Sequence, residues 1–596
     1  MKLFPALAFL VAFSLFAPNQ LPAQQTPQNS IAANRTALNA LLDEMWQDNL
    51  RHNPEFASSI GDLRYNDQLT DYSVRAQREN LARGQQYLLR LSAISTVGLN
   101  DQEKLSVELI TRQLIEDQER ARFKPWQMPV NQFWGVHTNL PAMATNLRFQ
   151  TVKDYEDWIA RLNAMPHVLD QITINMADGV DEKRVPPAYL LEKVLAQTKA
   201  ITDQKPEDSP FAQPLSRFPA TISAEDQNRL RVAMLTVITK QVLPAYQRLA
   251  RYLEKSYVPA GRKELGAWAL PDGDAYYNFC IRDSTTTNLT ANQIHQIGLE
   301  EVKRDEAAML VIAQSLGFKD LKSFQQAVKD NPKLHPASKD ALLANYQHYE
   351  DQMKAKLPSL FGRLPKAKLE VVAMPAFVEK NQAAAYYDVG TPDGSRPGYV
   401  TINTYNATGR SLADVEAIAY HEGIPGHHLQ LSIAQELTGM PEFRKYLGYT
   451  AFVEGWALYS ERLGKEVGFY QDPYSDYGRL EADIWRAIRL VVDTGVHSKH
   501  WTREQMVDYF RAHSAIDETN IQSEVDRYVA LPGQALGYKI GQLKILELRD
   551  RAKKQLGDKF DLSGFHDQVV DAGALPLDLL DQRINTWIGE QQAAKK

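Results

Sequence analysis

Apolar residues recur at steps of three and four along most of this chain of 596 residues, and this spacing constrains its fold more than any other feature. Such spacing places apolar side chains on one face of an α-helix. The pairs Thr290–Gln293 and Thr502–Gln505 have the spacing of capping boxes, which begin helices. The pattern predicts a mainly α-helical protein. It is clear at Leu38, Leu41, Leu42, Met45, Trp46 and Leu50, and similar spacing occurs over 100–120, 226–254, 292–316, 320–356 and 474–500.

Strand signals are few and close together in the sequence. Leu369 to Ala373 is short and β-prone, and Tyr399 to Tyr405 alternates between two sides. They predict one small sheet over 369–405. Proline and glycine interrupt the helical pattern near residue 260. We therefore expect an N-terminal helical half over 30–260 and a catalytic helical half over 261–596.

The first residues have the order of a secretory signal. Met1-Lys2 is followed by a run from Leu3 to Ala17 that is apolar apart from Ser14, and then by Pro22-Ala23. The apolar run is shorter than the roughly 18 to 20 residues that cross a bilayer. We expect a cleaved signal peptide over 1–23, a periplasmic or secreted protein, and no stable membrane insertion.

Charge and cysteine content exclude several classes of protein. The formal net charge is −6, from 67 Lys and Arg against 73 Asp and Glu, which does not suit a nucleic-acid-binding protein. The single cysteine, Cys280, excludes an intramolecular disulfide, a Cys-rich zinc knuckle and an iron–sulfur cluster. A bacterial lipid anchor would need a cysteine at the cleavage site, and none is present there.

The stretch from His421-Glu422 to His427-His428 is the strongest candidate for a metal site. In the usual zinc-hydrolase signature, two histidines one helical turn apart bind the ion. The glutamate that follows the first histidine acts as general base. We therefore expect His421 to bind the metal and Glu422 to be the base, on a helix that opens at Ser411.

The spacing of the second histidine leaves two candidates open. His427 and His428 follow His421 by six and seven residues, so on a straight helix they would lie about 9 and 10.5 Å along the axis from it. Pro425-Gly426 lies between, and proline breaks or kinks a helix. The angular position around the axis favours His428, whereas the shorter rise favours His427.

A third ligand is expected downstream, within a metal site over 411–461. Glu454 lies among apolar and aromatic residues, where a carboxylate is costly unless it is paired or bound to metal. Two histidines and a glutamate would leave a fourth position open for water. Glu461, two turns further on, could orient a ligand, although an exposed surface position is the expected one.

Several motifs carry a resemblance to a known family. They are His421-Glu-Gly-Ile-Pro-Gly-His-His-Leu-Gln430, Glu454-Gly-Trp-Ala-Leu-Tyr-Ser-Glu461, Val492-Asp-Thr-Gly-Val-His497, Pro532-Gly-Gln-Ala535, Gly537-Tyr-Lys539 and Thr285-Thr-Thr287. Together they resemble the bacterial family called domain of unknown function 885. The resemblance covers essentially the whole chain after the signal segment.

The family is regarded as a set of zinc-dependent peptidases. It is similar in outline to helical peptidases with a deep cleft, such as the thimet-type oligopeptidases and angiotensin-converting enzyme. The resemblance implies a large helical body with a deep cleft, the small sheet beside the metal helix, a zinc ion and a peptide substrate. Hydrolysis also needs donors to the oxyanion, and we expect them at His497 and Tyr538. Asp493, one turn before His497, could orient its ring.

The same family resemblance suggests which residues contact the substrate. In the resembling peptidases, an edge strand just before the metal helix pairs with the substrate backbone. The corresponding strand in this sequence is Tyr399 to Tyr405. Asn403 is therefore a candidate substrate-binding residue. A basic side chain could bind the terminal carboxylate of a peptide, because arginine suits bidentate contact. The candidates are Arg486, Arg489, Arg527 and Lys539.

The sequence therefore predicts an exported zinc-dependent metallopeptidase that hydrolyses short peptides. One alternative is a zinc amidase that uses the same residues on cell-wall peptides or other non-protein amides. Another is a non-catalytic periplasmic protein that binds peptide or metal. Manganese or cobalt would suit the ligand types nearly as well as zinc.

Overall fold

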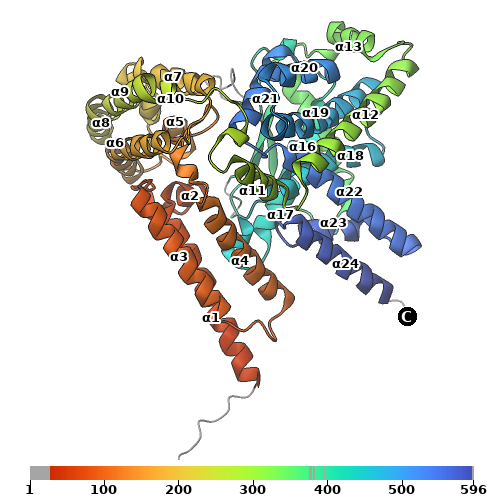
Figure 1. Cartoon of the computed structure of the whole chain (residues 1–596), viewed down its shortest axis with the longest axis horizontal. Coiled ribbons are helices and arrows are strands. Elements are labelled where there is room, and N and C mark those ends of the chain that lie inside the picture. The colour runs from red at the N-terminus through yellow and green to blue at the C-terminus, as the bar shows by residue number, and fades with distance from the viewer. Residues whose placement is uncertain (1–26, 375–378, 380–382, 393, 395, 594–596) are drawn as a thin grey trace, which may run out of the picture.

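The computed structural model describes residues 27–374, 379, 383–392, 394 and 396–593, and helices dominate it (Figure 1). The predicted mainly α fold is confirmed. The helices of the first part are α1 (Pro27–His52), α2 (Pro54–Ser59), α3 (Val74–Ser92), α4 (Asp101–Ala121), α5 (Val136–Asn146), α6 (Val152–Asp181), α7 (Ala188–Thr202), α8 (Ala224–Val237), α9 (Leu243–Tyr252) and α10 (Val258–Ala260). Those that follow are α11 (Gly273–Thr285), α12 (Ala291–Ser315), α13 (Leu321–Asp330), α14 (Lys339–Lys354), α15 (Leu357–Leu360), α16 (Val415–Glu422), α17 (His427–Glu436), α18 (Thr450–Glu466), α19 (Pro473–Ser498), α20 (Arg503–His513), α21 (Glu518–Ala530), α22 (Leu536–Leu556), α23 (Leu562–Val570) and α24 (Leu577–Ala593).

The helices form three groups in space (Figure 1). The long helices α1, α3 and α4 extend from one end of the molecule, and α5 to α10 gather beside their upper ends. The helices from α11 onward make up the remainder, in which α22 and α24 run side by side. The deep cleft implied by the resemblance stays a prediction.

The periodic pattern corresponds to observed buried helix faces. The six apolar residues quoted for residues 38–50 lie on α1 and are all buried. Both predicted capping boxes are present with reciprocal hydrogen bonds, one at Thr290 and one at Thr502. The spacing of apolar residues therefore predicts where the chain is helical, and a correctly identified capping residue predicts where a helix begins.

A three-stranded sheet has the order β1-β3-β2, with β1 (Leu369–Ala373), β2 (Ala385–Asp388) and β3 (Gly398–Ile402). β3 pairs in parallel with β1 and antiparallel with β2. The strand predicted to offer a free edge to a substrate is therefore the central strand, and neighbours on both sides use its backbone groups. Among the described strands, β1 and β2 are the ones at the edges.

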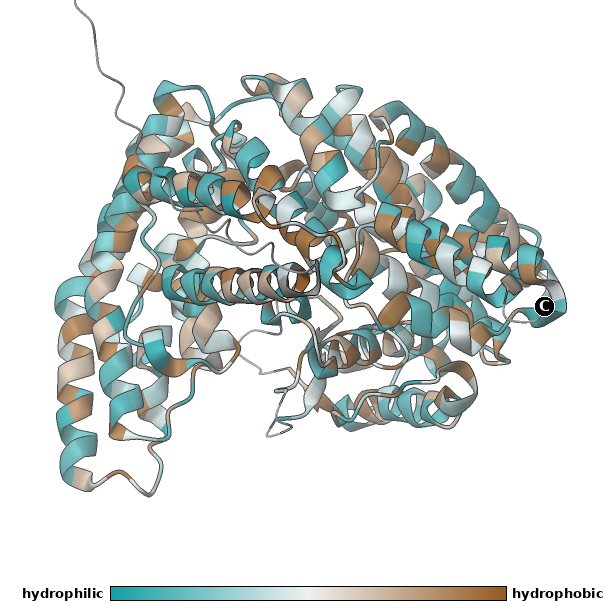
Figure 2. Ribbon diagram, turned by 90° about the horizontal axis from the view of Figure 1, so that it is seen from below, coloured by the Kyte–Doolittle hydropathy of each residue, from teal (hydrophilic) through white to brown (hydrophobic). Residues whose placement is uncertain are grey.

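Apolar residues run in stripes along the helices, and they meet in several hydrophobic clusters (Figure 2). One cluster joins α1 to α4 with helices from α11 onward. It includes Trp46, which stacks on Tyr446 with 5.4 Å between the ring centroids. A second cluster occupies residues 130–257. The beginning of the chain thus shares a core with the end of the chain.

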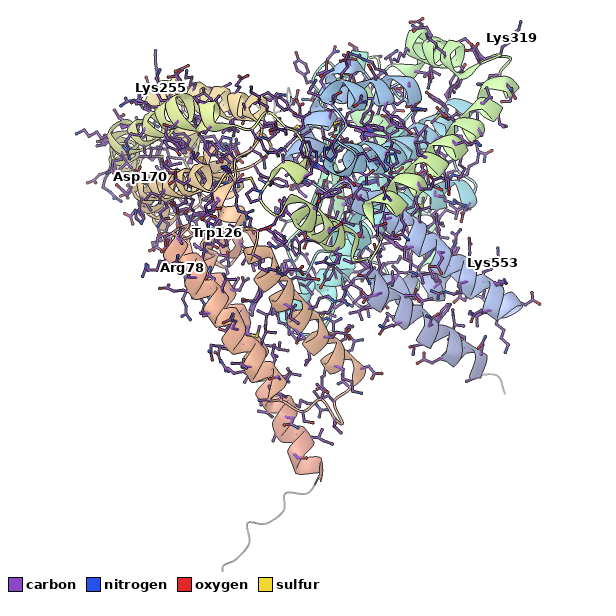
Figure 3. All side chains as sticks on the ribbon, viewed as in Figure 1. Arg78, Trp126, Asp170, Lys255, Lys319 and Lys553 are labelled. Carbon is purple, nitrogen blue, oxygen red and sulfur yellow. The ribbon has the colours of Figure 1, made fainter. Side chains whose placement is uncertain are left out.

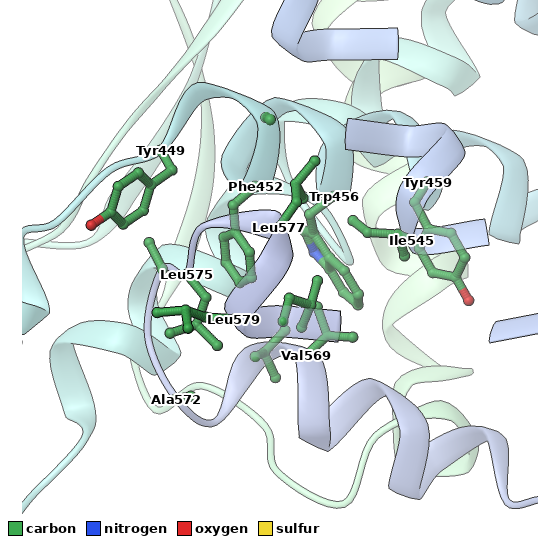
Figure 4. Packing of buried hydrophobic residues seen from close by; sticks show 14 of the residues in the cluster. Tyr449, Phe452, Trp456, Tyr459, Ile545, Val569, Ala572, Leu575, Leu577 and Leu579 are labelled. Atoms are coloured by element: carbon green, nitrogen blue, oxygen red, sulfur yellow. The ribbon is translucent and has the colours of Figure 1, made fainter. Parts of the chain in front are cut away.

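The apolar face of α18 packs into the first of these clusters (Figure 4). Phe452, Trp456 and Tyr459 lie on this face with Ile545 of α22 and Leu577 of α24 nearby. Helical geometry places the residue two positions after Phe452 roughly on the opposite side of the helix. The packing of α18 therefore directs its position 454 away from the hydrophobic core.

Charged side chains lie mainly at the periphery. Arg78, Lys255, Lys319 and Lys553 are exposed and point outward from the body (Figure 3). Within the described residues, no helix combines the length and the apolar character needed to cross a bilayer. The signal peptide predicted over 1–23 lies outside the described residues.

Candidate metal centre

The predicted metal helix consists of two helices joined by a tight turn. α16 ends at Glu422, α17 begins at His427, and residues 423–426 connect them. The break falls at the Pro425-Gly426 pair, as expected for a proline within a helical pattern. This break allows α17 to run in a different direction from α16.

The first of these helices begins later than predicted. Its first residue is Val415, and Asp414 precedes it without a capping bond from its side chain. The Ser411 hydroxyl accepts a hydrogen bond from the backbone N–H of Ala413 at 3.1 Å. This local bond forms a turn in place of the expected helix start, as serine often does.

Glycines allow the connecting turn to lie close to its neighbours. A Cβ atom on Gly426 would lie 2.0 Å from the carbonyl oxygen of His421. A Cβ atom on Gly423 would lie 1.7 Å from a carboxyl oxygen of Glu350 in α14. The same carboxyl group accepts a hydrogen bond from the backbone N–H of Ile424 at 3.0 Å. A larger residue at either glycine would displace the turn.

The turn brings His427 back to His421. Their ring centroids lie 4.8 Å apart and their planes are nearly perpendicular, at 87°. The indole N–H of Trp456 in α18 donates to the carbonyl oxygen of Pro425 at 2.8 Å. This bond attaches the turn to the helix that carries Glu454.

Glu454 completes a cluster with the two histidines. Its Oε2 lies 3.5 Å from Nε2 of His421 and 3.5 Å from Nε2 of His427. One potential ligand atom from each of the three residues lies within 4.8 Å of the others. The structure thus brings together three of the four residues predicted as metal ligands.

The fourth, His428, lies outside this cluster, which corrects that prediction. Its Nδ1 lies 2.9 Å from the Tyr387 hydroxyl of β2 and 3.5 Å from the Ser432 hydroxyl. Successive residues of a helix point about 100° apart. Only one of the two neighbouring histidines can therefore face His421, and α17 begins so that His427 does.

Glu461 is buried and contacts the cluster, contrary to the exposed position expected for it. It lies two turns after Glu454 on the same side of α18, and its Oε1 is 2.7 Å from Nδ1 of His421. A carboxylate partner keeps a proton on Nδ1 and leaves the Nε2 lone pair free. Arg486 of α19 lies 3.8 Å from the same oxygen.

Burial and charge shift the pKa values of the cluster. Burial disfavours the charged form of His421, but the neighbouring carboxylates of Glu454 and Glu461 outweigh this effect and raise the pKa of His421 to about 9. Burial also disfavours ionised Glu454, yet the two imidazoles hold its pKa well below the usual range. The centre of the cluster therefore favours positive charge.

The donor set fits a divalent metal ion. Tetrahedral bonds of about 2.0–2.1 Å place neighbouring ligand atoms about 3.3–3.4 Å apart, which is close to the observed 3.5 Å separations. Oε2 of Glu454 is buried and has no hydrogen-bond partner among the described residues. Two imidazoles and one carboxylate are a ligand set that leaves a position for water or substrate.

Glu422 lies beside the cluster at the end of α16 and is half-buried. Burial raises the pKa of its carboxyl group, while the charges of His421 and His427 act in the opposite direction. Glu422 thus combines a position next to the first candidate ligand, His421, with an environment that strengthens it as a base.

Tyr538 lies on α22, which crosses α18, the helix of Glu454, in direct backbone contact. A Cβ atom on Gly541 would lie 1.8 Å from the carbonyl oxygen of Ala451, and one on Gly455 would lie 2.5 Å from the Gly541 backbone. Burial raises the pKa of Tyr538, and the nearby charge of Glu454 raises it further. The hydroxyl is therefore protonated at neutral pH.

Sequence and structure comparisons place the chain among known proteins. Residues 54–584 match the family described as bacterial protein of unknown function, DUF885. The chain belongs to this family. A solved structure titled a "putative lipoprotein" from Colwellia psychrerythraea is 30% identical, with a TM-score of 0.89 over 94% of this chain and 100% of its own. One from Shewanella oneidensis, titled a "putative lipoprotein of unknown function", is 19% identical, with a TM-score of 0.73 over 92% of this chain and 99% of its own, and it shares the fold. No curated protein is detectably similar to this chain.

His497, in a motif that carries the DUF885 resemblance, has a structural position, which corrects its predicted role as oxyanion donor. Its Nδ1 accepts from the backbone N–H of Ala267 at 2.9 Å, and its Nε2 lies 2.9 Å from the carbonyl oxygen of Tyr528. Both ring nitrogens are thus occupied. Asp493 does not orient the ring, because it accepts from the Tyr277 hydroxyl at 2.6 Å.

Asn403 also has a structural position instead of the predicted contact with substrate. Its side-chain amide donates to the backbone oxygens of Glu379 and Ala383 at 2.7 and 3.1 Å, and its Oδ1 accepts from the Tyr405 N–H at 3.0 Å. The residue is buried. It holds the segment after β3 against the residues that precede β2.

The basic residues predicted to bind a substrate carboxylate differ in their surroundings: one is fully buried in ion pairs, and three are arginines close to Tyr538 or Glu461. Lys539 is fully buried and pairs with Asp483 at 2.6 Å and Glu301 at 3.1 Å, so it is unsuited to bind a substrate. Arg489 and Arg527 contact the ring of Tyr538 and lie near the cluster. Arg486 approaches it through Glu461.

Sequence reasoning missed Glu350, which holds the turn between α16 and α17. A signal for it exists, because Glu350 has the helical phase of Leu342, Tyr346 and Met353 on the buried face of α14. Burial raises its pKa well above the usual range. A carboxyl group on an apolar face indicates a specific partner, which here is the N–H of Ile424.

Proposed function

We propose that this DUF885 protein is a metal-dependent hydrolase of peptide bonds that uses zinc. The observation that carries the proposal is the approach of His421, His427 and Glu454 within 4.8 Å of one another, with Glu422 beside them. A zinc ion held by these three residues would polarise the scissile carbonyl and acidify a water molecule. The buried Glu461 supports the proposal, because it orients His421 as a carboxylate commonly orients a histidine ligand.

Two residues of the chain would move protons. Glu422 would act as general base, and burial, which raises its pKa, would make it a stronger base than an exposed glutamate. It would then pass the proton to the leaving amine. Tyr538 would donate a hydrogen bond to the oxyanion from its protonated hydroxyl.

Metal content tests the site itself. We expect one zinc per chain in the purified mature protein by mass spectrometry, and little in the His421→Ala and Glu454→Ala variants. Circular dichroism checks that each variant is folded. A folded wild-type protein that takes up no zinc even after incubation with the ion would contradict the proposal.

Peptide hydrolysis tests the reaction. Mass spectrometry of a peptide library incubated with the zinc-loaded protein should show cleavage products. Glu422→Gln should retain zinc and lower kcat by a factor of about 10² to 10⁴. Glu442→Gln is the control, because Glu442 pairs with Lys445 at the surface. Unchanged hydrolysis by Glu422→Gln would overturn the assignment of the base, and cell-wall peptides in the same screen test the amidase alternative.

We also propose that the protein acts in the periplasm or outside the cell. The order of residues 1–23 is that of a secretory signal, and a similar structure is titled a lipoprotein. Fractionation of cells that produce the full chain tests this, and recovery in the cytoplasm would contradict it.

A further inference from the structure

A group of cationic and aromatic residues lies next to the candidate metal centre, on α19, α21 and α22. Arg489 of α19 and Arg527 of α21 both contact Glu524, at 3.1 and 3.4 Å. Two guanidinium groups therefore share one carboxylate. One positive charge at this place is left without a matching carboxylate among the contacts of the two arginines.

The more deeply buried arginine has a donor without an acceptor. Arg489 is only 4% exposed. Its Nε donates to the Tyr528 hydroxyl and its Nη2 contacts Glu524, but its Nη1 has no hydrogen-bond partner in the described part of the chain. A buried charged donor without a partner is costly. An anionic ligand would satisfy both the donor and the excess charge.

Tyr538 connects this pair to the metal centre. The Arg489 guanidinium lies 4.5 Å from the centre of the Tyr538 ring, and Arg527 donates to the Tyr538 hydroxyl at 3.2 Å. Along α19, Arg489 follows Arg486 by three residues, a rise of about 4.5 Å. Arg486 lies 3.8 Å from Glu461, the partner of His421. Arg489 thus lies about one helical turn from Arg486, the residue that contacts Glu461.

Of the two arginine side chains, that of Arg527 is the more accessible. The Arg527 side chain is 20% exposed, and Tyr538 is half-buried. Guanidinium groups bind carboxylates through two parallel hydrogen bonds. A residue of extended peptide spans at most about 3.3–3.6 Å, so a carboxylate at this pair belongs close to the bond that would be cleaved.

We propose that Arg489 and Arg527 bind the C-terminal carboxylate of the substrate, so that the protein releases short pieces from the C-terminal end of peptides. This inference rests on the proposed hydrolase function, and it adds the chemical class of the substrate: peptides with a free C-terminus. Tyr538 lies between the carboxylate receptor and the metal ligands.

The test compares two peptide mixtures that differ only at the C-terminus. Both are N-acetylated tetrapeptide libraries, one with a free acid and one with a carboxamide. With the zinc-loaded wild-type protein, we expect kcat/KM for the acid to exceed that for the amide by about 10- to 150-fold, the effect of a charge-assisted hydrogen bond. Mass spectrometry should show cleavage near the C-terminus.

Arginine variants assign this preference to the pair. Arg527→Gln should reduce the ratio of kcat/KM for the acid to kcat/KM for the amide to near one. Arg527→Lys should restore part of the preference, because it keeps the charge. Arg489→Lys serves as the second variant at the buried position. Arg503→Gln is a matched control, because Arg503 lies 5.8 Å from the Tyr189 ring as Arg527 does from Tyr538.

The outcomes separate this inference from the hydrolase proposal. Equal rates for acid and amide, with Glu422→Gln inactive, would overturn the inference and leave the hydrolase standing. If neither mixture is cleaved, the hydrolase proposal fails, and calorimetric titration with the same libraries tests the receptor. Tighter binding of the acid that Arg527→Gln abolishes would support it. Equal binding, or no binding of either mixture, would overturn it.

Discussion

At the scale of single residues, the role of each histidine depends on what its ring nitrogens already contact. His428 uses Nδ1 with the Tyr387 hydroxyl, and His497 uses both nitrogens with backbone groups. His421 has a carboxylate on Nδ1 and directs Nε2 toward Glu454. The residue type alone does not distinguish a structural histidine from a candidate metal ligand, whereas the hydrogen-bond partners of its ring nitrogens do.

Paired alanine variants test the choice between neighbouring histidines. We expect His427→Ala to lose tightly bound zinc, because Nε2 of His427 lies 3.5 Å from Oε2 of Glu454. His428→Ala should keep close to wild-type zinc content, since its ring faces β2. Metal analysis after dialysis measures both. Zinc lost in His428→Ala and kept in His427→Ala would reverse the assignment.

Glu461 tests the importance of ligand orientation. Glu461→Gln removes the carboxylate from Nδ1 of His421, and we expect zinc affinity to fall by about 10- to 100-fold. Competition with a chelator measures the affinity. Glu466→Gln on the same helix is the control, because Glu466 pairs with Arg549 instead of the cluster. Equal affinities in the two variants would exclude an orienting role.

At the scale of elements, the site depends on how closely α18 and α22 approach. Gly455 and Gly541 allow backbone contact at the crossing, with Glu454 on one helix and Tyr538 on the other. On the opposite side of α18, Phe452 and Trp456 pack into the hydrophobic core (Figure 4). The crossing therefore determines where the candidate oxyanion donor lies relative to the candidate metal ligands.

Substitution at this crossing should separate the helices. Gly541→Ala would place a Cβ atom 1.8 Å from the Ala451 oxygen, and overpacking of this kind costs about 1–3 kcal/mol of unfolding free energy. Gly589→Ala in α24 has nothing within 4 Å of its new Cβ atom and should stabilise the protein by up to about 1 kcal/mol. Urea unfolding compares the two variants. A Gly541→Ala variant as stable as Gly589→Ala would mean that the crossing tolerates a wider separation.

At the scale of the whole molecule, both ends of the chain contribute to one core. The cluster that joins α1 to α4 with the later helices is accompanied by ion pairs at its surface. Arg112 of α4 pairs with Asp578 of α24 at 2.6 Å, and Arg120 pairs with Asp283 at 2.6 Å. The N-terminal helices thus stabilise the part of the molecule that contains the candidate metal centre.

Acid should destabilise the molecule through His497, which joins α19 to Ala267 and Tyr528. Burial lowers the pKa of His497 to about 3, whereas an unfolded histidine titrates near about 6.5. Below that pH the unfolded chain takes up a proton that the folded protein excludes, so stability is complete above about 6.5 and falls as the pH decreases toward about 3.

A glutamine at this position can replace both hydrogen bonds without titrating. Between pH 7 and pH 5, we expect wild type to lose about 2 kcal/mol more unfolding free energy than His497→Gln. Urea titrations at both pH values measure this difference. Other buried histidines, such as His566, titrate alike in both proteins. Parallel losses in the two proteins would show that His497 is not the responsible group.

The sequence by itself predicted the helical class and the small sheet, and it indicated His421, Glu422 and Glu454 as candidate site residues. These depend on local spacing, on capping residues and on the cost of a carboxylate in an apolar run. The same local signals could not choose between His427 and His428, because both satisfied part of the helical geometry.

Only the tertiary structure decided which of the two histidines faces His421 and Glu454. The path of residues 423–426 depends on Glu350, 74 residues before Ile424, and on Trp456, 31 residues after Pro425. Likewise, His497 is occupied by Ala267, 230 residues away. Spacing along the chain indicates which residues share a face of a helix. Contacts between segments that are distant in the sequence determine which residues that face packs against.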